Sequence, residues 1–543
     1  MRCRSSALLF AVALVLAMIP VQTAGAIAPQ ITRLGGADRY ATAVAIAKKG
    51  WPSGADTVLL AYGANYPDAV AATPLAALNN APILLTQTAS TPKVTLDEIK
   101  ALKVKNIILL GGASVISSAQ RTALQNQGYT VTRYGGANRY ATAQLIANAV
   151  EAAGGSKAAV LVTGVNYPDA LSMGSVAGMN KMPVIFSTAT GLPAETKAFI
   201  SQNKISKIVS VGYTASNATI KSQTQAAVGA SNVTYITGAD RYATSLNIIK
   251  RYQSIFIDSL AVATGVDYPD ALAGGVLAAK MKCPLLLIYP ASGASPVQRS
   301  YVLSRSPSTL CVFGGMAALS DARLKSLYLP GALAGKIIAL DPGHQAKADT
   351  SLEPIGPGAS EQKPKVAGGT SGVVTHIPES QTVLQIGLAL RTKLEAQGAT
   401  VVMTRTSQDV NISNSARAAV ANSAGADLFI RLHCDGSSDS STQGISMLVP
   451  ANNAWTNPIY ARSRSAGEVL QKAVIAATGA SDRGVVTRSD LAGFNYCQVP
   501  AVLIEMGFMT NPAEDRALNS SAYQAKLASG LTQGCVNWLG WSK

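Results

Sequence analysis

Short apolar runs alternate with longer stretches of helical spacing along most of the chain. Near its start, the apolar runs occur at Thr57–Ala61, Ile83–Leu85 and Ile107–Leu110. Helical spacing follows each of them, at Asp68–Leu78, Lys93–Leu102 and Ser114–Gln125. Strands that are apolar throughout and alternate with helices are typical of parallel sheets covered on both faces. The pattern therefore predicts an α/β protein built from βαβ units.

This pattern occurs three times, with a period of about one hundred residues. The string GGADRYATA begins at Gly35 and returns, slightly altered, at Gly135 and Thr237. A second string, close to NYPDA, follows each copy at nearly the same offset. The period is too long for a solenoid and suits a small domain. We therefore predict three tandem domains, at residues 27–131, 132–233 and 234–331.

The repeats carry two sets of candidate binding residues at equivalent positions. One set is the arginines of the G-A-[DN]-R motif: Arg39, Arg139 and Arg241. The other is the prolines that begin the strings PILL, PVIF and PLLL: Pro82, Pro183 and Pro284. Asp38 is placed to cap a helix, so the arginine motif has a structural interpretation as well as a ligand-binding one. No glycine motif follows GxGxxG or GxxxxGK[ST], so nucleotide binding is not indicated.

The remaining residues, 332–543, lack the repeat and predict one further α/β domain. Its strand-like runs are Ile337–Leu340, Thr400–Met403, Leu428–Leu432, Ile445–Val449 and Ala501–Ile504. Its helical patterns are Ser380–Gln397, Ser413–Ser423, Asn457–Thr478 and Pro512–Trp538.

Polar side chains stand where three of these strands end. His344 follows the first strand in the string DPGHQ, His433 ends LFIRLH, and Glu505 ends AVLIE. Ligands of open α/β sheets gather outside the carboxyl ends of the strands, so these residues are candidates to converge. Glu379 begins the helix that follows a long loop. Two histidines and one carboxylate form a common catalytic zinc set, and a second carboxylate would serve as general base and acid.

The choice of carboxylate is open at this level. Glu353 and Glu361 lie in the same loop as Glu379, and His376 precedes Glu379 by three residues. Either glutamate could replace Glu379 as a ligand, and His376 could be a ligand as well. A histidine at a strand end is also often structural.

The first residues predict a secretory signal peptide at 1–26. Arg2 and Arg4 precede the apolar run Ala7–Val21, and small residues follow at Ala24–Ala26. An uncleaved anchor is the alternative. No later run has transmembrane length, so we expect no membrane attachment after cleavage.

Composition adds two constraints. Outside the signal peptide, five cysteines without a CxxC pair form neither a disulfide framework nor a thiolate zinc site, although a Cys497–Cys535 bridge stays open. The net charge is +16, and residues 27–331 hold 26 Lys and Arg against 13 Asp and Glu. A basic, exported protein is expected to meet an anionic surface polymer rather than nucleic acid. A simple solubility charge is the alternative.

The repeat motifs G-A-D-R-Y-A-T, N-Y-P-D-A and P-[IVL]-L-L resemble the cell-wall-binding type 2 repeat family over residues 30–330. The resemblance implies three flavodoxin-like domains in a pseudo-threefold cluster. It also implies non-covalent attachment to anionic polymers of a Gram-positive wall, with the P-[IVL]-L-L segments involved.

The motifs DPGHQ, FIRLHCDG and VLIEMGFMTN, with the segment from Ile377 to Thr406, resemble the type 3 N-acetylmuramoyl-L-alanine amidases. The resemblance implies Zn²⁺ held by His344, Glu379 and His433, with Glu505 as catalytic acid and base. The expected protein is a secreted autolysin that cleaves the amide between N-acetylmuramic acid and L-alanine. The alternatives are a non-enzymatic wall or surface-layer protein with a glycan-binding domain, and a zinc peptidase that cuts within the stem peptide.

Overall fold

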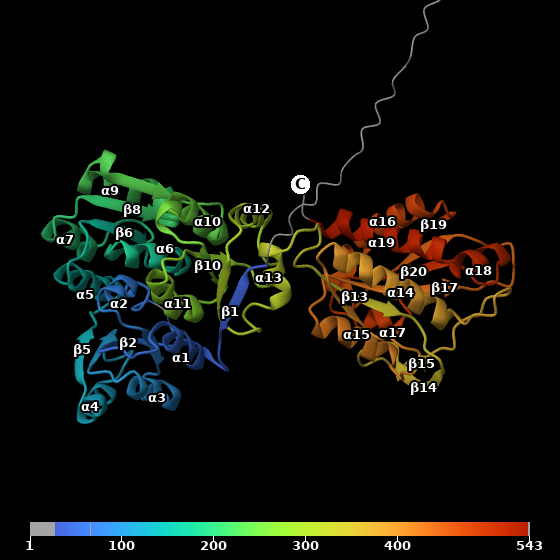
Figure 1. Cartoon of the computed structure of the whole chain (residues 1–543), viewed down its shortest axis with the longest axis horizontal. Helices are drawn as coiled ribbons and strands as arrows, with labels where there is room; N and C mark the ends of the chain where they lie inside the picture. Colours follow the sequence, from blue (N-terminus) through green and yellow to red (C-terminus); the bar gives the residue numbers. More distant parts are fainter. Residues whose placement is uncertain (1–27, 66, 541–543) are drawn as a thin grey trace, which may run out of the picture.

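The computed structural model describes residues 28–65 and 67–540, so the expected signal peptide lies outside the described residues. Two lobes follow one another along the chain (Figure 1). The first holds the three repeats, coloured blue to yellow-green, and the second holds the C-terminal domain, coloured yellow to red. Every large element belongs to an α/β unit, which confirms the predicted fold class.

Within the described residues, the first lobe contains three parallel four-stranded sheets of identical topology. Their orders are β3-β2-β4-β5, β7-β6-β8-β9 and β11-β10-β12-β1, the flavodoxin-like arrangement without its fifth strand. The strands are β1 (Gln30–Leu34), β2 (Thr57–Tyr62), β3 (Ile83–Thr86), β4 (Asn106–Leu110), β5 (Thr130–Tyr134), β6 (Ala158–Thr163), β7 (Val184–Ser187), β8 (Lys207–Val211), β9 (Val233–Ile236), β10 (Ser259–Thr264), β11 (Leu285–Ile288) and β12 (Thr309–Phe313).

Helices cover both faces of these sheets. They are α1 (Arg39–Gly50), α2 (Thr73–Leu78), α3 (Lys93–Ala101), α4 (Ser118–Asn126), α5 (Arg139–Ala152), α6 (Pro168–Met179), α7 (Ala194–Gln202), α8 (Tyr213–Ser216), α9 (Ala218–Val228), α10 (Arg241–Arg251), α11 (Pro269–Lys280), α12 (Pro296–Arg305) and α13 (Asp321–Tyr328). Two short 3₁₀ turns, Ala230–Asn232 and Gln253–Ile255, complete the lobe. The equivalent helices α2, α6 and α11 pack against one another at its centre.

The strand that precedes each arginine motif joins the sheet of the repeat before it. Strand β5 pairs with β4, and β9 pairs with β8. Strand β1, which precedes the first arginine motif, pairs with β12 of the third repeat, from Gln30 with Thr309 to Leu34 with Phe313. Figure 1 shows this blue strand among yellow-green elements. The three repeats therefore form a closed ring.

The helix that follows each arginine motif begins where the sequence predicts. Asp38 is the N-cap of α1, and its carboxylate accepts a hydrogen bond from the N–H of Ala41 at 2.8 Å. The helix predicted at Asp68–Leu78 is shorter in the structure, where α2 begins only at Thr73. In the other two repeats the equivalent helices begin at the proline of the NYPDA string, Pro168 and Pro269.

The C-terminal lobe contains a six-stranded sheet of order β16-β13-β17-β20-β18-β19, in which β18 runs antiparallel to β20. A two-stranded hairpin, β14-β15, lies outside it. The elements are β13 (Ile337–Pro342), β14 (Asp349–Pro354), β15 (Gln362–Val366), α14 (Glu379–Ala396), β16 (Thr400–Met403), α15 (Asn414–Ser423), β17 (Leu428–Asp435), β18 (Ile445–Pro450), α16 (Asn457–Thr478), β19 (Asp482–Arg488), α17 (Ala492–Asn495), β20 (Ala501–Phe508), α18 (Pro512–Leu518) and α19 (Ser521–Leu539).

The predicted strands of this lobe are all present, but the single helix expected at Pro512–Trp538 is wrong. Two helices stand there instead, because the side chain of Ser520 accepts from the N–H of Tyr523 and caps a new helix, α19. One face of the sheet carries α14, α16 and α19, and the other carries α15 and α17. The carboxyl ends of β13, β17 and β20 are left to position the polar residues described below.

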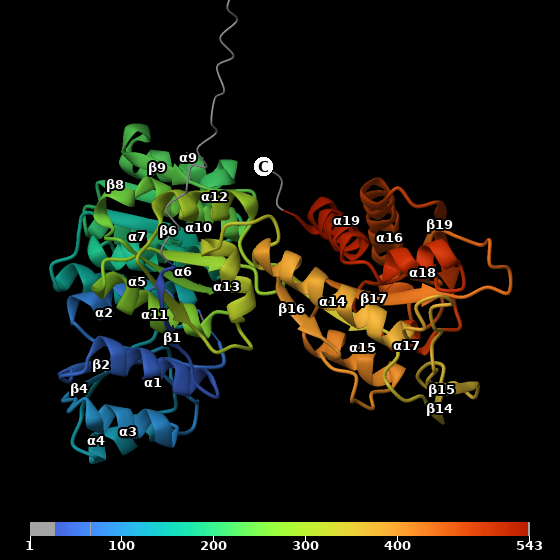
Figure 2. The same ribbon diagram turned by 45° about the vertical axis from the view of Figure 1, so that its right-hand side comes forward.

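The two lobes are joined by a fixed contact rather than by an open linker. Arg323 of α13 donates to the carboxylate of Asp427 at 2.6 Å and to the carbonyl of Gly335 at 2.8 Å. Asp427 also accepts from the N–H of Ile337, the first residue of β13. Both charged side chains of this pair are largely buried, and Figure 2 shows α13 between the lobes.

Two other features of the described residues concern the chain as a whole. Each of the five cysteines there is a buried free thiol, so the possible Cys497–Cys535 bridge is absent. Among residues 28–65 and 67–540, no helix combines the length and apolar character needed to span a bilayer.

Candidate metal centre

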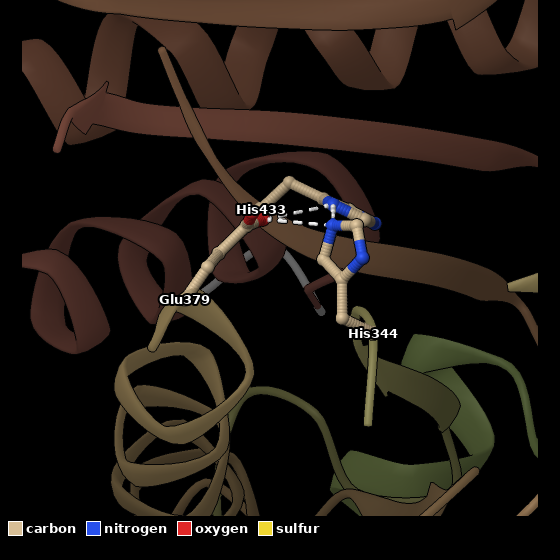
Figure 3. Close-up of side chains that lie close together, drawn as sticks. All are labelled: His344, Glu379 and His433. Atoms are coloured by element: carbon tan, nitrogen blue, oxygen red, sulfur yellow. Dashed lines mark hydrogen bonds and ion pairs between the residues drawn. The ribbon is translucent and has the colours of Figure 1, made fainter. Parts of the chain in front are cut away.

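Three side chains from separate elements meet at the carboxyl edge of the C-terminal sheet (Figure 3). The Nδ1 atom of His433 lies 3.1 Å from the Nε2 atom of His344 and 3.1 Å from the Oε1 atom of Glu379. The Nε2 atom of His344 lies 3.2 Å from the same Oε1 atom. These residues are a possible metal-binding group, with one ligand atom from each.

The backbone around His344 is shaped for this approach. His344 follows β13 in the left-handed conformation, with a φ of 56°. A Cβ atom added to Gly343 would lie 2.3 Å from the imidazole of His433, so only glycine allows that ring to pack beneath the turn. Glu379 is the first residue of α14, where the helix dipole favours a negative charge.

A buried charge cluster fixes the turn that carries His344. The carboxylate of Asp341 accepts from Arg417 at 2.7 Å and from Arg431 at 2.8 Å, and all three side chains are buried. Arg417 also donates to the carbonyls of Pro342 and His344, each at 2.9 Å. Burial alone would raise the pKa of Asp341, but the two arginines outweigh it and hold that pKa far below its usual range.

The loop before α14 orients two of the three side chains. The carbonyl of Ala367 lies 2.8 Å from Nδ1 of His344, so Nδ1 carries the proton and Nε2 presents its lone pair to the centre. The N–H of Thr370 donates to Glu379 Oε2, and the N–H of Cys434 donates to Glu379 Oε1, both at 3.0 Å. Gly369, with a φ of 78°, leaves room for both side chains.

The dimensions of the cluster fit a zinc ion. Ligand atoms at typical zinc distances and tetrahedral angles lie roughly 3.3 Å from one another. The three separations here are 3.1, 3.1 and 3.2 Å. Two imidazole nitrogens and a carboxylate oxygen are also the donor set that zinc prefers in catalytic sites. His344, Glu379 and His433 therefore fit the ion in both geometry and chemistry.

The ionisation of the three groups follows from their burial and from their contacts. Burial opposes a proton on His344, but the Glu379 carboxylate outweighs it and raises the pKa of His344. Burial lowers the pKa of His433. Burial would raise the pKa of Glu379, yet the two adjacent histidines stabilise its carboxylate and bring that pKa well below its usual range. Glu379 is therefore a carboxylate at neutral pH.

Glu505 lies next to this cluster on the neighbouring strand. It pairs directly with His433 in the β17–β20 register, so both side chains project from the same face of the sheet. Its Oε2 atom is buried and has no hydrogen-bond partner among the described residues. Burial, followed by the carboxylates of Glu379 and Asp435, raises the pKa of Glu505 well above its usual value.

The structure separates the alternative ligands from this centre. Glu353 accepts from the N–H groups of Asn414 and Ser415, and so caps α15. Glu361 and His376 are exposed. The structure therefore brings together Glu379, rather than these three, with the two strand-end histidines.

In the repeats, the three candidate arginines occupy equivalent positions. The guanidinium groups of Arg39, Arg139 and Arg241 donate to the carbonyls of Gly63, Gly164 and Gly265, at 2.5, 2.6 and 2.6 Å. Each of these bonds holds the helix start against the end of the strand that follows it. The motif therefore has the structural role that its capping residue indicated.

Two of these arginines also line crevices between successive repeats. One crevice, of about 260 Å³, lies between Asp68 and Arg139, and another, of about 250 Å³, lies between Asp169 and Arg241. Both lie outside the carboxyl ends of β2 and β4 or of β6 and β8, at the point where the strand order reverses. This is the usual ligand site of such sheets.

The three candidate prolines are buried and directly precede β3, β7 and β11, each of which is an edge strand of its sheet. The carbonyls of Pro82, Pro183 and Pro284 each accept a ladder hydrogen bond from the adjacent strand. A direct role for them in polymer binding stays a prediction.

Sequence reasoning missed several residues that hold the centre in place. The turn before His344 is held by three arginines, Arg405, Arg417 and Arg431. His344 is oriented by Ala367, and Glu379 by Thr370. One signal was available for Arg431, since an arginine inside the apolar run LFIRLH needs a buried acid and Asp341 ends the neighbouring strand. The backbone contacts of Ala367 and Thr370 leave no such signal.

Residues 338–537 match the family described as N-acetylmuramoyl-L-alanine amidase, and residues 33–121, 133–221 and 236–323 match cell wall binding domain 2 (CWB2). The chain is 31% identical over 511 residues to the N-acetylmuramoyl-L-alanine amidase LytC of Bacillus subtilis, covering 94% of each protein. An N-acetylmuramoyl-L-alanine amidase of Mycobacterium tuberculosis is 31% identical over 222 residues, which are 39% of this chain and 89% of that protein.

The solved structure of Cwp6 from Clostridium difficile has a similar fold, with a TM-score of 0.53 and 24% identity. It covers 94% of this chain, and the match spans 80% of that structure. The similarity to LytC extends over both lobes. The repeat lobe matches one family and the C-terminal lobe matches the other. The chain is therefore a cell wall amidase with three cell-wall-binding repeats, and it belongs to the N-acetylmuramoyl-L-alanine amidase family.

Proposed function

We propose that this protein is a secreted, zinc-dependent autolysin that cleaves the amide between N-acetylmuramic acid and L-alanine in peptidoglycan. The observation that carries the proposal is the cluster of His344, Glu379 and His433, whose size and donor set suit zinc, with Glu505 directly opposite His433. The relatives named above as N-acetylmuramoyl-L-alanine amidases support the same reaction.

The proposed roles of the residues follow from their positions. His344, Glu379 and His433 would hold Zn²⁺, which supplies Lewis acidity that polarises a carbonyl oxygen and makes water nucleophilic near neutral pH. Glu505 takes a proton from the attacking water, and it later gives that proton to the amine that leaves as the C–N bond breaks.

The test measures free N-terminal alanine released from purified peptidoglycan. We expect release by the zinc-loaded protein, its loss with a chelator, and its recovery with added zinc. Glu505→Gln should lower the rate by about 10²–10⁴-fold, as expected for loss of a general acid and base. Glu361→Gln, an exposed change in the same lobe, is the matched control.

Two results would contradict this function. Unchanged release by Glu505→Gln, or release that does not depend on zinc, would exclude the mechanism. New amino termini other than alanine would instead identify a peptidase that cuts within the stem.

We further propose that the three repeats, near residues 27–131, 132–233 and 234–331, attach the amidase non-covalently to an anionic wall polymer. The excess of 26 basic over 13 acidic residues in 27–331 supports this, as do the crevices that Arg139 and Arg241 line. Arg39 lies at the corresponding place where the ring closes, 3.8 Å from Asp267 of the third repeat.

Binding of the inactive Glu505→Gln chain to purified walls would test the attachment. We expect binding that weakens with salt and disappears after acid extraction of the anionic polymers. Undiminished binding to extracted walls would exclude these polymers as the partner.

A further inference from the structure

Glu505 opens onto a groove of about 550 Å³ that the proposed chemistry does not yet use. Its lining continues from Asp435 and Glu505 across Ser446 of β18 to Val486 and Arg488 of β19. Ser446 pairs with Glu505 in the β18–β20 register. A substrate whose scissile bond lies at the metal centre can therefore continue along this groove.

The groove occupies one defined face of the sheet. Val485 and Met447 face the opposite side, where a Cβ atom on Gly467 of α16 would lie within about 3.5 Å of each. The alternate positions Ser446 and Val486 face the groove, as the two-residue period of strands requires. Helix α16 therefore lies behind the sheet and can supply a control residue remote from the groove.

A network of fixed charges lies at the far end of the groove. The guanidinium of Arg488 donates to Asp490 through Nε at 2.8 Å and through Nη2 at 2.9 Å. Lys363 of the β14-β15 hairpin donates to the same carboxylate at 2.8 Å and to the backbone carbonyl of Asp490 at 2.9 Å. Two cations thus share one anion, so this trio carries a net positive charge.

The guanidinium of Arg488 has capacity for another partner. Its Nη1 group makes no hydrogen bond to any residue that the structure describes, and 40% of the side chain is exposed. Asp490 holds the planar group in place from one side, which lowers the entropy cost of binding a second carboxylate.

The two ends of the groove therefore have opposite charges. At the metal-centre end, Asp435, Asp482 and Glu505 outnumber one arginine, Arg483, so this end is acidic. Arg488 with Lys363 makes the other end basic. A ligand that binds along this groove needs an uncharged amide at the metal-centre end and an anion at the Arg488 end. A peptide with an acidic residue soon after the scissile amide has this pattern.

We propose that Arg488 binds a free carboxylate of the stem peptide on the leaving-group side of the scissile amide. Asp490 and Lys363 are positioning residues that orient the guanidinium. This inference rests on the proposed amidase function and extends it to substrate selection. The carboxylate belongs either to the second residue of the stem or to its C-terminus, since both are free acids that the same fork could bind.

The experiment uses the zinc-loaded full chain and three synthetic muramoyl peptides of the same sequence. The first has both carboxylates free, the second has an amide at residue two, and the third has an amide at the C-terminus. Arg488→Gln and Arg488→Lys are compared with wild type on each substrate. Arg464→Gln on α16, a similarly exposed arginine paired with Glu468, is the matched control.

We expect one of the two amides to raise the wild-type KM about tenfold, the effect of losing a charged hydrogen bond at a partly exposed site, with kcat nearly unchanged. Arg488→Gln should bring the KM for the free acid up to the value for that amide and leave the amide substrate unaffected. Arg488→Lys should restore only part of the difference, and Arg464→Gln should match wild type.

The amidated substrate for which wild type and Arg488→Gln have the same KM identifies which carboxylate is bound. Equal KM values of wild type on all three substrates would overturn the proposal, as would an equal loss on all three in Arg488→Gln. If wild type cleaves none of the three, the proposed amidase function fails and this proposal fails with it.

Discussion

Arg405 joins two parts of the metal centre through one guanidinium group. It follows β16, is 3% exposed, and donates to the carbonyls of Pro342 and Gly343, both at 2.8 Å, in the turn before His344. It also donates to the carbonyl of Ser380 at 2.7 Å, one residue after Glu379. We therefore predict that Arg405→Ala weakens both the fold of this lobe and its affinity for zinc.

The size of the effect follows from the contacts that are lost. An unpaired buried acceptor costs about 1–3 kcal/mol, and removal of one partner from a buried charged network costs about 3–5 kcal/mol. We expect a loss of about 3–5 kcal/mol in the free energy of unfolding of the C-terminal lobe. Loss of an outer-shell partner should weaken zinc binding about 10–100-fold.

Arg405→Lys should recover little of either property. Burial and the nearby Arg417 lower the pKa of Arg405 to about 10, so its guanidinium is still charged at neutral pH. A lysine ammonium in the same place lacks the planar fork that reaches the carbonyls of Pro342, Gly343 and Ser380 in different directions.

Zinc affinity would be measured by competition with a chromogenic chelator, and stability by calorimetry of the full chain. Arg391→Ala is the control, because this half-buried arginine of α14 contacts the sulfur of Met403 at 4.0 Å and hydrogen-bonds to none of the three ligands. If Arg405→Ala has the same zinc affinity and the same unfolding temperature as Arg391→Ala, the reasoning is refuted.

Three further predictions concern other parts of the chain. The pKa of Asp341 in the folded protein lies below its unfolded value of about 3.9. The stability that the ionised carboxylate contributes is therefore complete above that pH and is lost as pH falls towards the folded pKa. Asp341→Asn should unfold at lower urea than wild type at pH 7, and the difference should be smaller at pH 3. Deletion of residues 28–34 should lower the unfolding temperature of the repeat lobe and promote self-association, seen by calorimetry and sedimentation, because it exposes the edge of β12. His376→Ala should bind zinc as wild type does, whereas His344→Ala should bind it at least a hundredfold more weakly.

The central strands could be predicted from the sequence because burial on both faces makes them apolar throughout. The run Ile445–Val449, for example, differs from β18 by one residue. The hairpin β14-β15 and strand β19 were not predicted. The residues of β15, Gln362–Val366, are polar at three of five positions, and those of β19 are largely exposed, so neither has the apolar signal of a buried strand.

The meeting of His344 and His433 followed from topology alone, because both stand at the carboxyl ends of neighbouring parallel strands. The choice among Glu353, Glu361 and Glu379 could not follow from topology. It depends on how the loop folds over the site, with Gly369 in a left-handed conformation and Thr370 bonded to Glu379. Such contacts use backbone groups that every residue carries.

The pairing of Gln30–Leu34 with Thr309–Phe313 also has a consequence for the order of folding. Local βαβ contacts form early, whereas a strand pair so distant in sequence must overcome a large loss of chain entropy. Strand β1 is the first part of the repeat lobe to be synthesised, yet it has no neighbour until β12 exists. A chain that ends early would therefore carry an unpaired, protease-sensitive N-terminal segment, which would distinguish it from complete molecules.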